Sequence, residues 1–431
     1  MYQYLSFAIK TVWMGLFSVI LFSSCEGALP DETQVVVCVP VYGQSLALGE
    51  EAVLITDADS LVKASSGRIC SEGLSRSFGY YEDHGWKRRL KRLLHYPRRR
   101  FETSAYALAG ELASRLGRDT AVCVIVGGAG ATPISRLDSH SEAYRLFLDD
   151  IRLTHEAAAK RGARLLVPAV CWMQGESDMF DYTYVDYARL LRQFAVDLDR
   201  DIRRLTGQLE PVRVICYQSC CLSVCWEFNP LSIPCYELSI PQAQWQLVAQ
   251  GDPFVAGAPT YPYDFVSDHL HLDARSQMEV GRIHAAAALD VLRHRSCQRG
   301  LWPLSVLRVD TAVSSDSSML SVRFNHAVDI DTVHVSPADH YGLSVVTPQG
   351  TDILNRVTVR GQELLLSCSR SVQGCRVRYG ANGNRGKSGR RYGARGNLRC
   401  RYPVADAYRP WCYLFDLPEG YRSVATISQP E

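Results

Sequence analysis

The sequence lacks the features that mark several classes of protein. Its 431 residues carry a net charge of only +2, so no general attraction to nucleic acid or to acidic membranes is expected. No segment repeats with a period of about 20–50 residues, which argues against solenoids and propellers. Beyond the N-terminus, no apolar run approaches the ~20 residues of a membrane-spanning helix. The composition, 47% hydrophobic and 21% charged, is that of a globular protein.

The N-terminus has the pattern of an export signal. Lys10 precedes an apolar run over 11–22, and Ser23 and Ser24 then lead to Cys25. This pattern predicts a signal peptide over residues 1–24. Cysteine after Leu-Phe-Ser-Ser resembles a bacterial lipobox, which implies cleavage before Cys25 and lipid attachment to its sulfur. A signal peptide or anchor without lipid is the alternative. We expect an exported protein in the periplasm, on the outer membrane or at the cell surface, touching the membrane only through that anchor.

Fifteen cysteines are many for one chain, and oxidising compartments allow disulfides. Four of them lie in apolar runs, where we expect small buried hydrophobic side chains: Cys38, Cys123, Cys171 and Cys216. A local group is either a disulfide clip or a zinc site: Cys220, Cys221, Cys225 and Cys235. Its spacing matches no standard zinc pattern, so no metal is predicted. Cys368 and Cys375 are placed to bridge a hairpin.

Residues 33–296 alternate between strand-like and helix-like patterns. Continuous apolar runs predict strands at 35–42, 121–128, 164–172, 212–218 and 253–259. Apolar residues at helical spacing predict helices at 103–116, 142–160, 184–205 and 276–293. The alternation indicates a three-layer α/β/α domain with a mainly parallel sheet covered on both faces. Ligands of such sheets bind beyond the carboxyl ends of the strands.

Residues 300–431 have a different pattern, with short alternating runs separated by turn residues at 320–328, 343–350, 356–361 and 375–380. This pattern predicts a small C-terminal β-sandwich. The segment 381–401, rich in glycine and arginine, is expected to be a long loop. The sandwich has three possible roles: binding glycan, packing against the first domain, or acting as a spacer. We expect its deletion to harm solubility more than chemistry.

Two motifs place reactive side chains after strands. Gly43-Gln44-Ser45 follows the first strand, so Ser45 is either a nucleophile or a helix N-cap. Asp268-His269-Leu270-His271 follows the last, and an aspartate three residues before a histidine can fix its tautomer. A solvated turn or a metal site are the alternatives for the second motif. Serine after the first strand and Asp-x-x-His after the last match the order of an esterase.

A third motif, Trp172-Met173-Gln174-Gly175-Glu176-Ser177-Asp178, follows the third strand. Together the three segments resemble the SGNH-hydrolase superfamily, and within it the sialate O-acetylesterase-like and acetylxylan-esterase branch. The resemblance covers about 34–295 and implies the flavodoxin-like SGNH fold. The C-terminal segment GKSGRRYGARGNLR resembles β-domains that accompany such esterases in Bacteroidetes-type lipoproteins.

The resemblance implies a role for each motif. Ser45 matches the nucleophile, His271 the general base and Asp268 the carboxylate that orients it. His269 does not fit the spacing. Gln44 and Glu176 are expected to support the site loops. A glycosidase-type pair of Glu176 and Asp178 is the less favoured alternative.

The resemblance also implies an oxyanion hole. Its donors would be the backbone N–H groups of Ser45 and Gly130 and the side-chain amide of Gln174, with Gly128 as the alternative glycine. The family reads Gly-Gly-Thr where this chain has Gly130-Ala131-Thr132, so Ala131 is a departure.

These residues predict a serine carbohydrate O-acetylesterase that uses no cofactor and acts on acetylated sialic acid or a plant polysaccharide such as xylan. Another SGNH activity, such as a lipase or arylesterase, is one alternative, and a glycan-binding protein without activity is another. Basic residues at 87–100 and 385–401 are either solvated surface or a rim for an anionic glycan. The sequence leaves the oligomeric state open.

Overall fold

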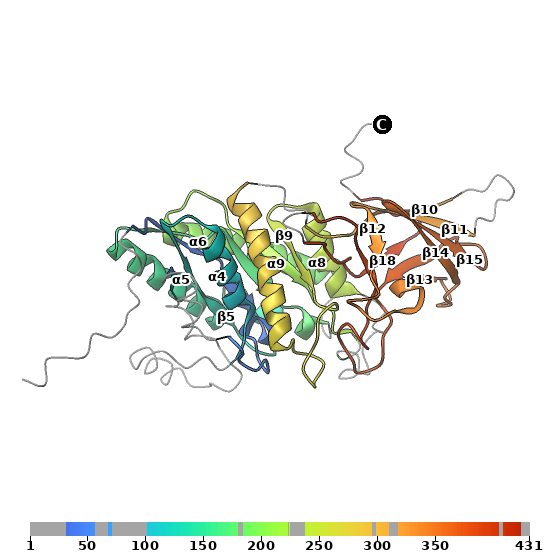
Figure 1. The fold of residues 1–431 in the computed structure, drawn as a ribbon, viewed down its shortest axis with the longest axis horizontal. Coiled ribbons are helices and arrows are strands. Elements are labelled where there is room, and N and C mark those ends of the chain that lie inside the picture. The colour runs from blue at the N-terminus through green and yellow to red at the C-terminus, as the bar shows by residue number, and fades with distance from the viewer. Residues whose placement is uncertain are drawn as a thin grey trace, which may run out of the picture.

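The computed structural model describes residues 32–56, 68–70, 101–179, 184–222, 224, 238–294, 299–309, 318–404 and 408–423. An α/β unit comes first and an antiparallel β unit follows it (Figure 1). Three features predicted from sequence lie outside the described residues: the N-terminal signal with Cys25, the basic cluster 87–100, and the pair Cys225 and Cys235.

The parallel sheet is built from strands that are interrupted halfway. The first predicted strand forms β1 (Val35–Cys38) and β2 (Val41–Gly43), and the second forms β4 (Thr120–Cys123) and β5 (Val126–Gly128). The third forms β6 (Arg164–Leu166) and β7 (Ala169–Met173). Pro40 and Pro168 lie in two of the breaks, because proline has no N–H for the ladder.

These half-strands share one order, with β8 (Arg213–Gln218) and β9 (Phe254–Pro259) beyond them. The first halves pair as β3-β4-β1-β6, where β3 is Ile69–Cys70, and the second halves as β5-β2-β7-β8-β9. Every pair in both sets is parallel. The predicted parallel sheet is therefore confirmed.

Helices cover both faces of this sheet. Val36 packs into a core with residues of α5 (Glu142–Lys160), α6 (Tyr184–Thr206) and α8 (Ser239–Gln250). Its neighbour Val37 packs into a second core with residues of α1 (Ser45–Leu48), α4 (Ser104–Arg115) and α9 (Ala274–Leu292). Side chains alternate between the faces of a strand, so the two cores lie on opposite sides of the sheet. The three-layer architecture is confirmed, and α8 is a helix that the sequence analysis did not predict.

The C-terminal unit consists of antiparallel sheets. One contains β10 (Pro303–Arg308), β11 (Met319–Phe324), β15 (Glu363–Cys368) and β14 (Leu354–Arg360). A second contains β13 (Leu343–Val346), β16 (Arg376–Tyr379) and β18 (Phe415–Pro418), and β12 (Val328–Ile330) pairs with β17 (Leu398–Cys400). The rings of Phe324 and Phe415, one from each larger sheet, lie 6.2 Å apart between centroids. The two sheets thus pack as the predicted sandwich.

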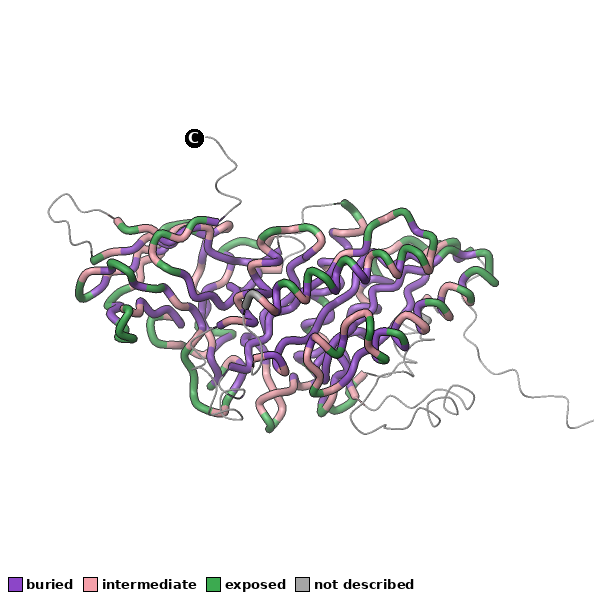
Figure 2. The backbone as a smooth tube through the Cα atoms, turned by 180° about the vertical axis from the view of Figure 1, so that it is seen from behind, coloured by how far each residue is buried: buried purple, intermediate pink, exposed green. Residues whose placement is uncertain are grey.

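The two units share a core, and buried segments run through both of them (Figure 2). Polar groups are also paired across the boundary: the hydroxyls of Tyr261 and Tyr379 lie 3.0 Å apart. The amide nitrogen of Gln218 donates to the carbonyl of Leu414 at 2.9 Å, and its amide oxygen accepts from the N–H of Leu414 at 2.8 Å. Of the three roles open for the C-terminal unit, packing against the first unit is therefore observed. The division at about residue 300 stays a prediction.

Ten cysteines are buried and form no disulfide: Cys38, Cys123, Cys171, Cys216, Cys220, Cys221, Cys368, Cys375, Cys400 and Cys412. Cys38, Cys123, Cys171 and Cys216 are at most 1% exposed, which confirms them as small core side chains. Cys368 and Cys375 both carry free thiols and are not bridged. No helix among the described residues is long and apolar enough to cross a membrane.

Candidate active site

Three neighbouring strand ends approach each other so closely that side chains do not fit. A Cβ on Gly43, at the end of β2, would lie 2.0 Å from the carbonyl oxygen of Met173 at the end of β7. A Cβ on Gly128, at the end of β5, would lie 1.8 Å from the carbonyl oxygen of Gly43. The N–H of Gln44 donates to the carbonyl of Met173 at 3.0 Å. The three predicted site loops therefore begin side by side at the carboxyl edge of the sheet.

Ser45 is the first residue of α1 and is 4% exposed. The N-cap position belongs to Gln44, so the interpretation of Ser45 as a cap is wrong. Within the described part of the chain, neither the N–H nor the hydroxyl of Ser45 has a hydrogen-bond partner. Both groups are therefore available to a substrate.

The Asp-x-x-His motif folds into a compact turn. Asp268 Oδ2 lies 2.6 Å from His271 Nδ1, while Oδ1 accepts from the N–H groups of Leu270 at 2.8 Å and His271 at 3.0 Å. His271 Nε2 is buried and has no partner among the described residues. The imidazole is thus fixed through one nitrogen and open at the other, as a general base requires.

Negative charge surrounds this imidazole. Burial alone would lower the pKa of His271, but the hydrogen bond to Asp268 and the charges of Asp268, Glu50 and Glu176 outweigh burial and raise it. For Asp268, burial would raise the pKa, but the bonds from His271 and from the turn hold it below its usual value. The pair therefore consists of an ionised carboxylate and an imidazole of increased basicity.

The turn and the serine loop are linked through shared partners. Gln277, on α9 six residues after His271, donates to the carbonyl of Leu46 at 3.0 Å and accepts from Ser104 N at 3.1 Å. The N–H of Glu50 donates to the carbonyl of Ser45 at 3.0 Å, and the charge of Glu50 acts on His271. The loops that carry Ser45 and His271 are therefore held in one region. Glu50 was not predicted as a site residue, and no motif marks it.

The Gly130 loop lies beside the same carboxylate, because a Cβ on Gly130 would lie 2.6 Å from Glu50 Oε1. The N–H of Gly130 has no hydrogen-bond partner in the described part of the chain. Ala131 has φ of +50°, a conformation that favours glycine. The departure from Gly-Gly-Thr therefore falls on a strained residue.

Gln174, predicted as an oxyanion donor, has its side chain bonded within the loops. Its side chain is fully buried, and its amide nitrogen donates to Asp178 Oδ2 and, at 3.2 Å, to the carbonyl of Thr132. Its amide oxygen lies 3.0 Å from the hydroxyl of Tyr187. Both amide hydrogens thus have acceptors, and in this conformation none points to a substrate. An oxyanion role would require Asp178 to release the amide, so that role stays a prediction.

The last two carboxylates of the QGESD motif act within the loops. Asp178 is fully buried and accepts from the N–H of Ile134 at 3.0 Å, which joins the third-strand loop to the Gly130 loop. Glu176 is 2% exposed and accepts from Tyr217 Oη at 2.6 Å; burial raises its pKa. Gln44 Oε1 accepts from the N–H of Ser177 at 3.3 Å. Through these contacts, Asp178, Glu176 and Gln44 hold the site loops in place.

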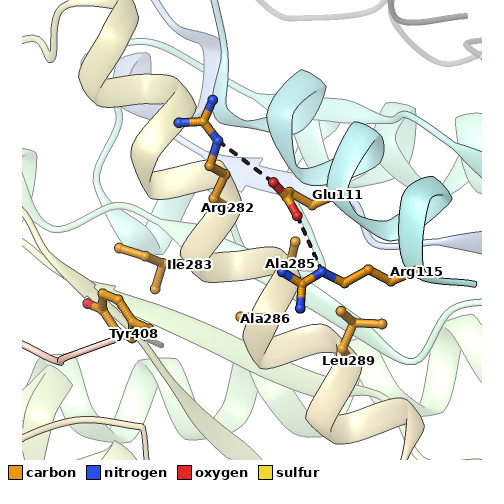
Figure 3. A pocket seen from close by; sticks show the side chains of 8 residues that line it. All are labelled: Glu111, Arg115, Arg282, Ile283, Ala285, Ala286, Leu289 and Tyr408. Carbon is orange, nitrogen blue, oxygen red and sulfur yellow. Dashed lines mark ion pairs between the residues drawn. The ribbon is translucent and has the colours of Figure 1, made fainter. Parts of the chain in front are cut away.

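A separate pocket lies between α4 and α9 and has a volume of about 150 Å³ (Figure 3). Arg115 and Arg282 both face Glu111 there, at 3.4 Å and 3.8 Å. None of the predicted site residues lines this pocket. No group of three or more potential metal ligands occurs within the described ranges.

Comparisons with known proteins support the esterase prediction. Residues 103–290 match a family described as carbohydrate esterase, sialic acid-specific acetylesterase. The matched segment includes Gln174, Glu176, Asp268 and His271, whereas Ser45 precedes it. No curated protein sequence matches the chain.

Solved structures of other proteins match this chain over part or most of its length. A carbohydrate acetylesterase from Xanthomonas citri has a TM-score of 0.54 and 13% identity, over 89% of this chain and 80% of its own. A protein from Arabidopsis thaliana has a TM-score of 0.40 and 17% identity, over 60% and 98%. A carbohydrate acetylesterase family member from Sinorhizobium meliloti has a TM-score of 0.34 and 18% identity, over 61% and 100%. The similarity to the Xanthomonas protein supports the fold of both units. Residues 103–290 are thus similar to the sialic acid-specific carbohydrate acetylesterases, and the chain is an ester hydrolase.

Proposed function

We propose that this protein removes acetyl groups from carbohydrates by a serine mechanism, with Ser45 as nucleophile, His271 as general base and Asp268 as its orienting carboxylate. The observation that carries the proposal is the state of His271: one ring nitrogen is bound to Asp268, and the other is buried with no partner among the residues that the structure describes. This imidazole lies in a segment that matches an acetylesterase family.

The proposed reaction uses the groups at the strand ends. Ser45 attacks the acetyl carbonyl while His271 takes the hydroxyl proton, and the N–H groups of Ser45 and Gly130 stabilise the oxyanion. Each such donor is worth ~3 kcal/mol in the transition state. His271 then protonates the sugar hydroxyl that leaves, and it activates the water that hydrolyses the acetyl-enzyme.

Acetate release tests the proposal. Protein lacking the predicted signal peptide, residues 1–24, is assayed on acetylated xylan, pectin, acetylated sialic acids and an aryl acetate. Ser45→Ala should lower kcat by ~10⁴-fold or more. Ser114→Ala, an exposed serine on α4, is the matched control and should retain full activity. The preferred substrate would name the glycan.

Two alternatives correspond to other outcomes of this assay. Hydrolysis of lipid or aryl esters without hydrolysis of glycan acetates would identify another esterase. A folded protein that releases no acetate from any substrate would favour a glycan-binding protein. Export and lipid attachment at Cys25 are separate proposals, which mass spectrometry of the membrane-extracted protein tests.

A further inference from the structure

The turn with Asp268 and His271 is the tip of a narrow hairpin that spans 263–273. The N–H of Val266 donates to the carbonyl of His271 at 2.9 Å, and the N–H of Asp273 donates to the carbonyl of Asp264 at 3.1 Å. Phe265 and Leu272 form a bridge between these bonds. The position of the imidazole therefore depends on how the base of this hairpin is held.

A loop of the C-terminal unit, residues 385–396, binds that base and is called the clamp loop below. Arg390 donates to both carboxylate oxygens of Asp264, from Nε to Oδ1 at 2.9 Å and from Nη2 to Oδ2. Its backbone N–H donates to the carbonyl of Tyr263 at 3.1 Å. The side chains of Arg390 and Asp264 are only 34% and 29% exposed. A bidentate pair of this kind fixes direction as well as distance.

The clamp loop also approaches the hairpin by its backbone. Gly389 has φ of +86°, and a Cβ there would lie 2.7 Å from the carbonyl oxygen of Tyr263 and 2.9 Å from the ring of Phe265. At the tip, the backbone of Ser388 and the charge of Lys387 both act on the imidazole of His269. The pKa of His269 is lowered, first by burial and then by the charge of Lys387. The loop thus contacts the hairpin at its base and at its tip.

The clamp loop is itself anchored within the C-terminal unit. The carbonyl of Arg390 accepts from the N–H of Ser336 at 3.0 Å. Arg395 donates to the carbonyls of Ser336 at 3.0 Å and Pro337 at 2.8 Å. The N–H of Gly393 donates to the carbonyl of Gly389 at 3.0 Å, which closes the loop on itself. The clamp loop therefore connects the hairpin to the β unit through hydrogen bonds.

We propose that the clamp loop positions the general base: Arg390, through Asp264, holds the hairpin so that His271 stays aligned for proton transfer with Ser45. The C-terminal unit is then part of the catalytic apparatus. This inference rests on the proposed function, because alignment matters only for a chemical step. Displacement of a reacting group by about 1 Å can cost about 100-fold in rate.

Substitutions at two adjacent arginines test the clamp. Arg390→Ala removes the bidentate pair with Asp264. Arg390→Lys keeps the positive charge but replaces the planar guanidinium with a single ammonium group. Arg391→Ala is the matched control, because Arg391 carries the same charge but is 65% exposed and makes only a long, single ion pair of 3.9 Å with Asp264, which contributes little. We expect Arg390→Ala to lower kcat ~10–100-fold with KM changed less than about threefold. Arg390→Lys should recover part of the loss, and Arg391→Ala should stay within about twofold.

A second measurement does not depend on activity. Hydrogen exchange of the Val266, Leu270 and His271 amides, which are bonded within the hairpin, should be faster in Arg390→Ala than in Arg391→Ala. Adding Asp264→Ala to Arg390→Ala should cause little further loss, because the two residues act as one pair. Equal exchange and equal kcat in the two arginine variants would overturn the clamp. If exchange is faster in Arg390→Ala but the wild-type protein shows no Ser45-dependent hydrolysis, the contact between the clamp loop and the hairpin is retained and the proposed function is rejected.

Discussion

The chain contains the same turn twice, once in each unit. Asp268 and His271 form one, and Asp331 and His334 form the other. In the second turn Asp331 Oδ2 lies 2.9 Å from His334 Nδ1, and Oδ1 accepts from the N–H groups of Val333 at 3.1 Å and His334 at 3.0 Å. The same three contacts occur in the first turn, and in the second His334 Nδ1 also lies 3.1 Å from Asp331 Oδ1. The Asp-x-x-His sequence therefore adopts this geometry in both units.

The surroundings of the two turns differ. The His271 side chain is 13% exposed and sees the charges of Glu50 and Glu176, whereas the His334 side chain is 63% exposed. Arg399 donates to Asp331 Oδ2 at 2.8 Å, so the second carboxylate is already paired with a cation. The same turn thus carries a candidate general base in the α/β unit, whereas in the β unit it forms structural hydrogen bonds. Location and charge distinguish the two, not the motif.

The largest difference in kcat is expected between substitutions of the two histidines, His271 and His334. His271→Ala should lower kcat for acetate release by ~10⁴-fold or more, because the proposed serine nucleophile loses its general base. His334→Ala should change kcat less than about twofold, because its ring is exposed and lies in the β unit. Parallel kinetics on one substrate check both. Equal losses in the two variants would contradict the assignment of His271.

The two aspartates should separate activity from stability. Asparagine can still accept the turn bonds, so Asp268→Asn should keep the fold but lower kcat ~10³–10⁴-fold through loss of the correct tautomer. Asp331→Asn should leave kcat unchanged and lower the free energy of unfolding by ~1–2 kcal/mol, after allowance for solvent screening.

The stability effect at Asp331 has a defined pH dependence. Burial would raise the pKa of Asp331, but its bonds to the His334 backbone and to Arg399 lower it to about 2. A depressed carboxyl pKa stabilises the fold above the unfolded pKa of ~4, and this contribution is lost as the pH falls towards 2. Urea unfolding at neutral pH and at pH ~2.5 should show the difference between wild type and Asp331→Asn becoming smaller in acid. A constant difference would contradict the pKa argument.

The sequence was informative where local pattern determines structure. Apolar runs predicted all five main strands of the parallel sheet, and Pro40 and Pro168 mark breaks that the runs alone do not show. The pairing of Asp268 with His271 could be predicted because the two residues are only three positions apart and belong to one turn. The competing contacts of Gln174 could not be predicted, because Asp178, Tyr187 and Thr132 reach it only through tertiary packing.

The expectation for the C-terminal unit shows the same limit. From the sequence, deletion of residues 300–431 should harm solubility more than chemistry. In the structure, Gln218 and Tyr261 of the α/β unit bond to Leu414 and Tyr379, so deletion would leave buried polar groups unpaired. It would also remove Arg390 from the catalytic hairpin. We now expect the truncated chain to lose both stability and activity.

The smallest expected effect concerns the charge of Glu50, which acts on His271. Glu50→Gln removes one of the negative charges that raise the pKa of His271, so that pKa should fall. The base acts only when neutral, so the acid limb of kcat/KM should move to lower pH by a few tenths of a unit, with a similar plateau. Glu51→Gln, the adjacent exposed carboxylate, is the matched control and should leave the limb in place. A shift to higher pH in Glu50→Gln, or equal shifts in both variants, would show that Glu50 does not set the basicity of His271. The surroundings of the two turns would then still differ in burial, in the charge of Glu176 and in the bond from Arg399.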